Sequence, residues 1–186
     1  MPDKVTILGF AGSLRKNSYN KGLLRAALSL TPKNIEIVTY DLDDIPAFNQ
    51  DKEGSPPEAV SEFKKMIRKA DAVLIVTPEY NYSIPGVLKN AIDWASRPFG
   101  DNAFRGKPVA FMGASTGRIG TARAQYHLRQ CCVFLEMYPI NKPEIFVPFA
   151  KEKFDENGTL KDKETKERIR ELLEALGAWT RKLKTG

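Results

Sequence analysis

Short apolar runs and helical stripes follow one another along the whole chain. The runs predict strands at residues 4–8, 35–40, 72–76, 108–112 and 144–147. Apolar residues spaced three to four apart predict helices at residues 21–30, 57–70, 85–95, 122–135 and 163–183. The run at 72–76 is nearly all apolar, which predicts a central strand covered on both faces. Strands that alternate with helices indicate a doubly wound, three-layer α/β fold with a five-stranded parallel sheet.

The predicted sheet also predicts where a ligand binds. Right-handed crossovers leave few topologies, and 2-1-3-4-5 is the common order for five strands. In that order the ligand lies at the carboxyl ends of strands 1 and 3. Residues 9–20, 77–85 and 113–120 form the loops at this edge. Because no linker or repeat interrupts the pattern, we expect residues 1–186 to form a single domain.

The first of these loops has the residues of a phosphate site. It leads into a helix, whose N-terminus offers free N–H groups and the positive end of a dipole. We expect Gly9 and Gly12 to let the backbone turn tightly. The expected phosphate ligands are Ser13, Arg15, Ser18 and Asn20. The alternative is an ordinary turn in which Ser18 or Asn20 only caps the helix. No dinucleotide fingerprint is present, so the phosphate would belong to a mononucleotide.

The other two loops favour a planar ring. Pro78 and Pro85 restrict the backbone of the second loop, and Tyr80 and Tyr82 supply flat surfaces beside backbone donors. The third loop, rich in Gly, Ser and Thr, offers N–H groups and Ser115 to the polar end of such a ring. The alternative is that both are ordinary loops made of turn-forming residues.

Residues that carry out catalysis by themselves are scarce. His127 is the only histidine, and its place in the middle of a helix favours a surface or interface role. We find no metal-ligand spacing and no nucleophile elbow, and therefore expect no metal and no catalytic side chain. A bound cofactor would then carry the chemistry.

Composition and charge limit the class of protein. The 186 residues are 42% hydrophobic and 28% charged, with a net charge of +6. Much of the positive excess is mixed with Glu on the last helix, so we expect no nucleic-acid partner. We also expect no membrane insertion and no signal peptide, because no long apolar run is present and Met1–Lys4 leads straight into a strand. Adjacent Cys131 and Cys132 lie on a core stripe, which favours reduced core thiols and a cytoplasmic location.

Three stretches resemble the NADPH-dependent FMN reductase family, most closely its bacterial quinone and chromate reductases. They are residues 12–20, 78–94 and 113–120, and residues 125–130 and 141–144 are also similar to that subgroup. The resemblance implies a flavodoxin-like fold and bound FMN. It implies the phosphate ligands given above and an isoalloxazine site lined by Pro78, Glu79, Tyr80 and Asn81, with Ser115 and Gly117 at the pyrimidine side. Arg118 stands where many relatives have glycine, and its role is open.

This resemblance implies an enzyme in which NADPH or NADH reduces FMN at N5. The reduced flavin would then reduce a quinone, an azo or nitro compound, or a metal oxyanion such as chromate, in a ping-pong mechanism. The alternatives are a flavodoxin-type electron carrier and a non-catalytic nucleotide-binding module. We also expect a homodimer or homotetramer, with Trp94, Tyr126 and His127 as interface residues. Arg123, Tyr126 and Glu144 are candidates for a second, polar interface.

Overall fold

One parallel sheet forms the centre of the computed structural model, which describes residues 4–185. Its strands in the described residues are β1 (Val5–Ala11), β2 (Ile35–Thr39), β3 (Ala72–Val76), β4 (Pro108–Ala114), β5 (Tyr138–Pro139) and β6 (Ile145–Val147). Neighbouring strands follow the order β2-β1-β3-β4-β5, and β6 also pairs with β4. The predicted order 2-1-3-4-5 and the α/β fold class are therefore confirmed.

The fifth position of the sheet holds two strands where the sequence predicted one. β5 pairs with the first residues of β4, from Pro108 onward, whereas β6 pairs with the last three, from Met112 onward. A two-residue strand that contains a proline is too short to leave an alternation pattern and lacks one N–H donor. The sequence therefore showed only the second strand, at 144–147.

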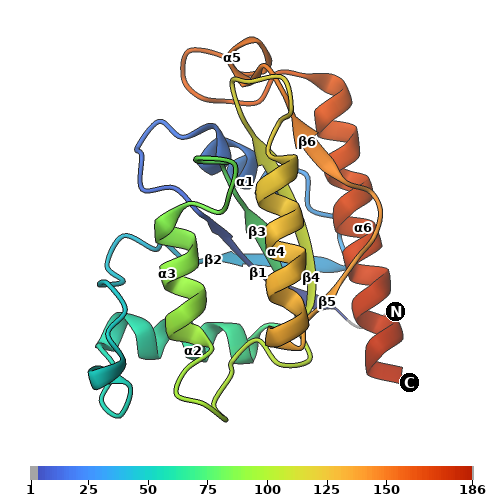
Figure 1. Cartoon of the computed structure of the whole chain (residues 1–186). Coiled ribbons are helices and arrows are strands. Elements are labelled where there is room, and N and C mark those ends of the chain that lie inside the picture. The colour runs from blue at the N-terminus through green and yellow to red at the C-terminus, as the bar shows by residue number, and fades with distance from the viewer. Residues whose placement is uncertain (1–3, 186) are drawn as a thin grey trace.

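Helices cover both faces of the sheet (Figure 1). α1 (Tyr19–Ser29) and α6 (Lys163–Thr185) pack in one core cluster, and α2 (Glu58–Lys69), α3 (Gly86–Ala95) and α4 (Ala122–Leu135) pack in the other. Successive strand residues point to opposite faces, as Ile7 and Leu8 of β1 show by entering different clusters. The described chain also contains a 3₁₀ helix at Gln50–Lys52 and a short helix, α5 (Ala150–Lys153).

Two surface predictions are wrong. Trp94 is 1% exposed, and its indole N–H donates to the carbonyl of Pro46 at 2.9 Å, so it is a core residue and not an interface residue. The polar residues of 149–161 also predict a surface loop, but this segment contains α5 and the buried side chains of Phe154 and Leu160. Phe154 and Leu160 are isolated apolar residues with only polar residues and a glycine between them. They form no helical or strand pattern, so the sequence did not predict their burial.

The cysteines are free thiols in the core. Cys132 is buried and Cys131 half-buried, as the sequence predicted. Burial, and next the neighbouring Cys131, raises the pKa of the Cys132 thiol to about 12. Because the thiolate is the reactive form, Cys132 is inert at neutral pH.

Across residues 4–185, the helices lack the combination of length and apolar character that crossing a membrane requires. The signal-peptide prediction also involved Met1–Asp3, which lie outside the described residues.

Candidate functional site

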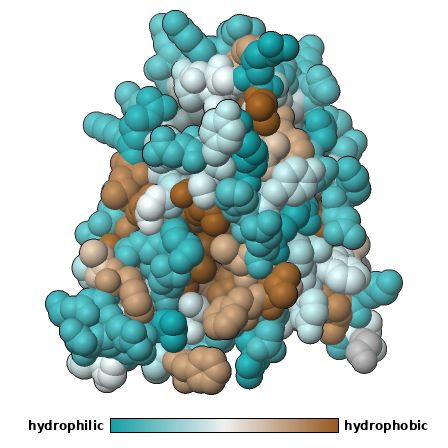
Figure 2. Space-filling model, viewed as in Figure 1, coloured by the Kyte–Doolittle hydropathy of each residue, from teal (hydrophilic) through white to brown (hydrophobic). Residues whose placement is uncertain are grey.

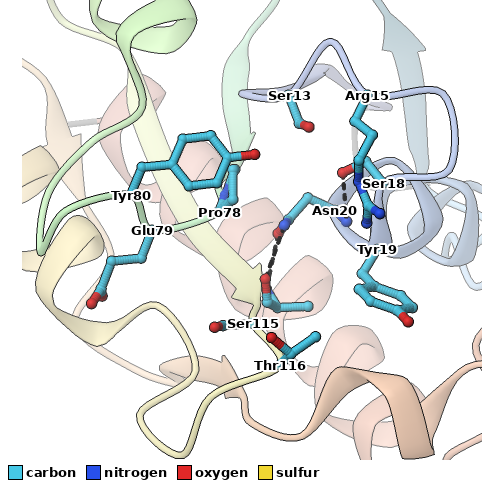
Figure 3. A pocket seen from close by; sticks show the side chains of 11 residues that line it. Ser13, Arg15, Ser18, Tyr19, Asn20, Pro78, Glu79, Tyr80, Ser115 and Thr116 are labelled. Atoms are coloured by element: carbon cyan, nitrogen blue, oxygen red, sulfur yellow. Dashed lines mark hydrogen bonds between the residues drawn. The ribbon is translucent and has the colours of Figure 1, made fainter.

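A cavity of about 360 Å³ opens at the carboxyl edge of the sheet, where β1, β3 and β4 end. Its side chains converge from the loop after β1, from the first residues of α1, and from the loops after β3 and β4 (Figure 3). The lining residues are Ser13, Arg15, Ser18, Tyr19, Asn20, Pro78, Glu79, Tyr80, Ala114, Ser115 and Thr116. This is the edge at which the predicted topology placed a ligand.

Eight of the ten predicted site residues line this cavity. Asn81 and Gly117 do not; both are exposed and lie next to lining residues. Sequence reasoning missed Tyr19, Ala114 and Thr116. Ala114 was missed because β4 extends two residues past the predicted strand end at Met112. Tyr19 gave no signal, because it follows the cap residue as the first residue of a helix.

The first loop, residues 12–18, connects β1 to α1. Ser18 caps the helix, and its Oγ accepts from the N–H groups of Asn20 and Lys21 at 3.2 and 3.5 Å. The capping role considered as the alternative is therefore correct for Ser18, although the hydroxyl proton is still available to a ligand. Ser13 and Ser18 are 3% and 4% exposed, so both hydroxyls lie deep in the cavity.

The two glycines of this segment act differently from the prediction. Gly9 lies within β1, and neither Gly9 nor Gly12 has a positive φ angle. A Cβ on Gly12 would lie 3.0 Å from side-chain atoms of Leu88 in α3. Gly12 is thus needed for close packing of the loop on α3, and the tight turn is made without left-handed glycine.

Arg15 stands at the rim of the cavity. Its side chain is exposed, and its Cζ lies 5.5 Å from the centre of the Tyr19 ring. Figure 3 shows both side chains on the α1 side of the cavity. A forked cation beside the N-terminus of α1 makes this end of the cavity attractive to an anion.

The second loop contributes Pro78 and Tyr80 as a wall. In Figure 3 the Tyr80 ring reaches toward the centre of the cavity, whereas the carboxylate of Glu79 points away from it. That carboxylate is 8% exposed and pairs with Arg123 of α4, with 2.6 Å between Oε1 and Nε. Glu79 therefore faces the cavity with its backbone, and its side chain binds the neighbouring helix.

The third loop rests on β6. The N–H of Ser115 donates to the carbonyl of Val147 at 3.0 Å, and Ser115 Oγ accepts from the N–H of Gly117 at 3.1 Å. Arg118 is exposed, and no ion pair or hydrogen bond to it is found within residues 4–185. The loop is thus held at its base while its tip is open to solvent.

His127 is half-buried on α4, with Nδ1 2.9 Å from the Oγ of Ser83. The side chain thus binds the loop after β3, and the expected surface or interface role stays a prediction. It is absent from the cavity lining.

The arrangement can hold a ligand with an anionic end and a flat end. Hydroxyls, helix N–H groups and Arg15 surround one end, and Pro78, Tyr80 and the Ser115 loop border the other.

Comparisons with known proteins match this arrangement. The family model for NADPH-dependent FMN reductase matches residues 5–152. The chain is 52% identical to the NAD(P)H-dependent FMN reductase of Pseudomonas aeruginosa over 186 residues, covering 99% of this chain and all of the relative. It is 48% identical to the potato NAD(P)H:quinone oxidoreductase, covering 97% and 95%. The solved structure of FerB, a flavoenzyme NAD(P)H:(acceptor) oxidoreductase of Paracoccus denitrificans, superposes with a TM-score of 0.87 at 36% identity, covering 96% and 98%.

Proposed function

The chain belongs to the NADPH-dependent FMN reductase family, and we propose that it uses FMN to pass electrons from NAD(P)H to quinones. Its relatives are oxidoreductases, and the enzyme class and the cofactors FMN and NAD(P)H follow from the family. The convergence of eight predicted flavin-site residues on one cavity is the structural observation that carries the proposal.

The order of polar and flat groups along the cavity supports FMN as its ligand. Ser13, in the loop after β1, and Ser18, the cap of α1, are buried polar residues that line the cavity. A phosphate there would meet their hydroxyls and the helix N–H groups. Tyr80 and Pro78 offer flat apolar surface to the ring. We propose that Ser13, Arg15, Ser18 and Asn20 hold the phosphate. The ring would lie among Pro78, Glu79, Tyr80, Asn81, Ser115 and Gly117, with Glu79 contributing its backbone.

Bound FMN supplies a ring that accepts a hydride and passes electrons on. The protein binds and orients this ring, and it holds the phosphate by contacts that are alike before and during the reaction. N–H groups near Ser115 would stabilise negative charge at the pyrimidine side. We propose that no side chain acts as a catalytic acid or base.

Large apolar side chains near the cavity favour a flat organic acceptor. Leu14, Tyr80 and Ile119, one from each site loop, are each about half exposed (49–52%). An aromatic quinone buries apolar area on such surfaces, whereas an oxyanion does not. We therefore propose quinones as the preferred acceptors. Azo and nitro compounds share the flat shape, and chromate would be reduced less efficiently.

We propose that donor and acceptor occupy the same opening in turn. Initial rates at several NADPH concentrations should then give parallel double-reciprocal lines, the sign of two separate half-reactions. Acceptor in excess should compete with NADPH. Intersecting lines would show that both substrates bind together, and the shared opening would then be wrong.

An electron carrier without its own NADPH oxidation is the second candidate. The net charge of +6 argues against it, because the flavodoxin-type carriers considered above are acidic. Consumption of NADPH by the purified protein and a quinone alone would exclude the carrier.

We further propose a homodimer or homotetramer of a single-domain chain in the cytoplasm. Figure 2 shows hydrophobic surface between α3 and α4. Phe99, Val133 and Phe134 are 85%, 83% and 67% exposed and line one groove on this side. A self-complementary interface would cover such a patch. Arg123 pairs with Glu79, and Glu144 pairs with Lys142, both within the chain. Fewer charges are therefore free to form the second, polar interface. Sedimentation at micromolar concentration tests this assembly, and a monomer would contradict it.

The deciding experiment is the absorption spectrum of the purified protein, followed by NADPH oxidation with a benzoquinone. We expect the bands of bound flavin and turnover that depends on FMN. A protein that stays colourless after incubation with FMN would overturn the proposed function.

A further inference from the structure

The loop between β3 and α3 contains a strained turn. Asn81 and Tyr82 both have left-handed backbone, with φ of 50° and 68°. Tyr80 and Ser83 flank them and exchange two backbone hydrogen bonds of 3.1 and 2.9 Å, as in a two-residue hairpin. Asparagine tolerates this conformation, but a tyrosine is strained in it. Such strain persists only where contacts outside the turn hold it.

Arg123 of α4 supplies those contacts. Its Cζ lies 3.5 Å from the centre of the Tyr82 ring, so the guanidinium stacks on the strained residue. Its Nε donates to Glu79 Oε1 at 2.6 Å. One guanidinium therefore contacts a residue before the turn and a residue within it, and Tyr80 and Asn81 lie between these two points.

Glu79 is in turn fixed to the start of α4. Its Oε2 accepts from the backbone N–H groups of Arg123 and Ala124 at 3.0 and 3.3 Å. Thr121, the cap residue of this helix, makes no side-chain capping bond. Glu79 therefore caps α4 from another segment, and its low exposure strengthens these charge-assisted bonds.

We propose that Arg123 is a positioning residue for the flavin ring: by holding the turn, it fixes Tyr80 at the cavity wall. Arg123 itself does not line the cavity, so it acts through Glu79 and Tyr82. This inference rests on the proposed function, because it takes the isoalloxazine as the group that meets Tyr80. A second contact from the same helix, between His127 and Ser83, supports the far end of the turn.

The test compares variants at Tyr82, which leave α4 intact. Tyr82→Ala loses the stacking but keeps the left-handed strain, whereas Tyr82→Gly gives the Asn-Gly pair that this turn favours without outside support. We expect Tyr82→Ala to weaken FMN binding about fivefold to tenfold. Tyr82→Gly should stay within about twofold of the unchanged protein. Titration of apoprotein with FMN, followed by flavin fluorescence, measures both.

Variants of Arg123 test the same point from the helix. Arg123→Met should weaken FMN and riboflavin by the same factor, about fivefold to tenfold, because the ring is affected and the phosphate is not. Arg123→Lys, which keeps the charge but not the planar stack, should be intermediate. Adding Tyr82→Gly to Arg123→Met should restore most of the affinity, because glycine removes the strain that Arg123 holds in the turn. If Arg123 only stabilised the fold, the second substitution would not restore FMN binding. Arg170→Met removes an exposed arginine of α6 as the matched control.

The outcomes separate the two claims. If the unchanged protein binds neither flavin, both the proposed function and this inference fail. If it binds FMN but Tyr82→Ala and Arg123→Met bind equally well, the inference alone fails. A loss for FMN only would also overturn it, because Arg123 would then act on the phosphate.

Discussion

The carboxamide of Asn20, at the start of α1, exchanges two hydrogen bonds with the backbone of Ala114, the last residue of β4. Nδ2 donates to the carbonyl at 3.0 Å, and Oδ1 accepts from the N–H at 2.9 Å. These two bonds join two walls of the cavity, and Asn20 is only 3% exposed. Only one Nδ2 proton is left for a ligand. We infer that Asn20 holds the site together as well as contributing to the proposed phosphate contacts.

Replacing Asn20 by Asp should destabilise the protein. The new carboxylate oxygen would face the carbonyl of Ala114 without a proton between them. We expect the free energy of unfolding in urea to fall by about 1–3 kcal/mol, the cost of an unsatisfied buried group. Asn17→Asp, at an exposed position of the same loop, is the control and should change it little. Equal stability of the two variants would contradict the buried bridge.

Arg15→Ala should separate phosphate recognition from ring recognition. The lost charge-assisted bond is worth about 1.5–3 kcal/mol, so FMN affinity should fall about tenfold to a hundredfold. Riboflavin, which lacks the phosphate, should bind as before. Fluorescence titration of both flavins measures this, with Lys33→Ala as a control that removes one exposed charge elsewhere. Equal losses for the two flavins would place Arg15 away from the phosphate.

Gly113→Ala should deform the cavity where β3 and β4 end. A Cβ at this position would lie 2.1 Å from Thr121 Oγ1 and 2.2 Å from the carbonyl of Thr77. Because that carbonyl belongs to the backbone, the ends of β3 and β4 would have to separate. We expect a loss of about 1–3 kcal/mol in urea unfolding together with weaker FMN binding. Gly86→Ala, where a Cβ meets nothing within 4 Å, should leave both nearly unchanged.

Asp162 should make the stability depend on acid pH. Hydrogen bonds from Thr165, and further from Lys153, outweigh burial and lower the pKa of this carboxyl. Its Oδ2 accepts from the N–H of Thr165 at 2.9 Å, at the start of α6. The folded protein therefore binds fewer protons here than the unfolded chain. The stabilisation is complete above the unfolded pKa of about 3.9 and is lost as pH falls through the lower folded value.

Asp162→Ala should accordingly cost about 0.5–2 kcal/mol at pH 7, and the difference from the unchanged protein should shrink below about pH 4. Thermal unfolding at several pH values checks the trend. Glu171→Ala, at an exposed position further along α6, is the control. A difference that stays constant with pH would mean that the Asp162 carboxylate does not stabilise the start of α6.

The sequence predicted the sheet order and the edge of the site because both depend on local patterns. Strands such as β3 are continuous apolar runs, and parallel strands bring their following loops to one edge. β5 could not be predicted because two residues carry no period. The burial of Trp94 was missed because its partner, Pro46, lies in an irregular loop that no pattern describes.

The sequence predicted which residues lie at the site better than it predicted where their side chains point. Ser13 and Arg15 line the cavity as expected. The loop that follows a parallel strand lies at the carboxyl edge of the sheet, so its position can be predicted from the strand. The orientation of Glu79 depends on Arg123, 44 residues away. A single sequence contains no signal for such a pair. The bonds of Asn20 to Ala114 likewise join residues 94 positions apart. The sequence could not show them, so Asn20 was assigned only to the ligand.

The cap that Glu79 places on α4 also constrains the order in which the chain folds. A helix of fourteen residues is marginal by itself in water, and here its first turn lacks a local cap. The N–H groups of Arg123 and Ala124 gain their partner only when the loop after β3 has reached its final position. We therefore expect the start of α4 to consolidate late, once the loop after β3 is in place. Amide exchange in these two residues consequently reports whether the wall of the cavity has formed.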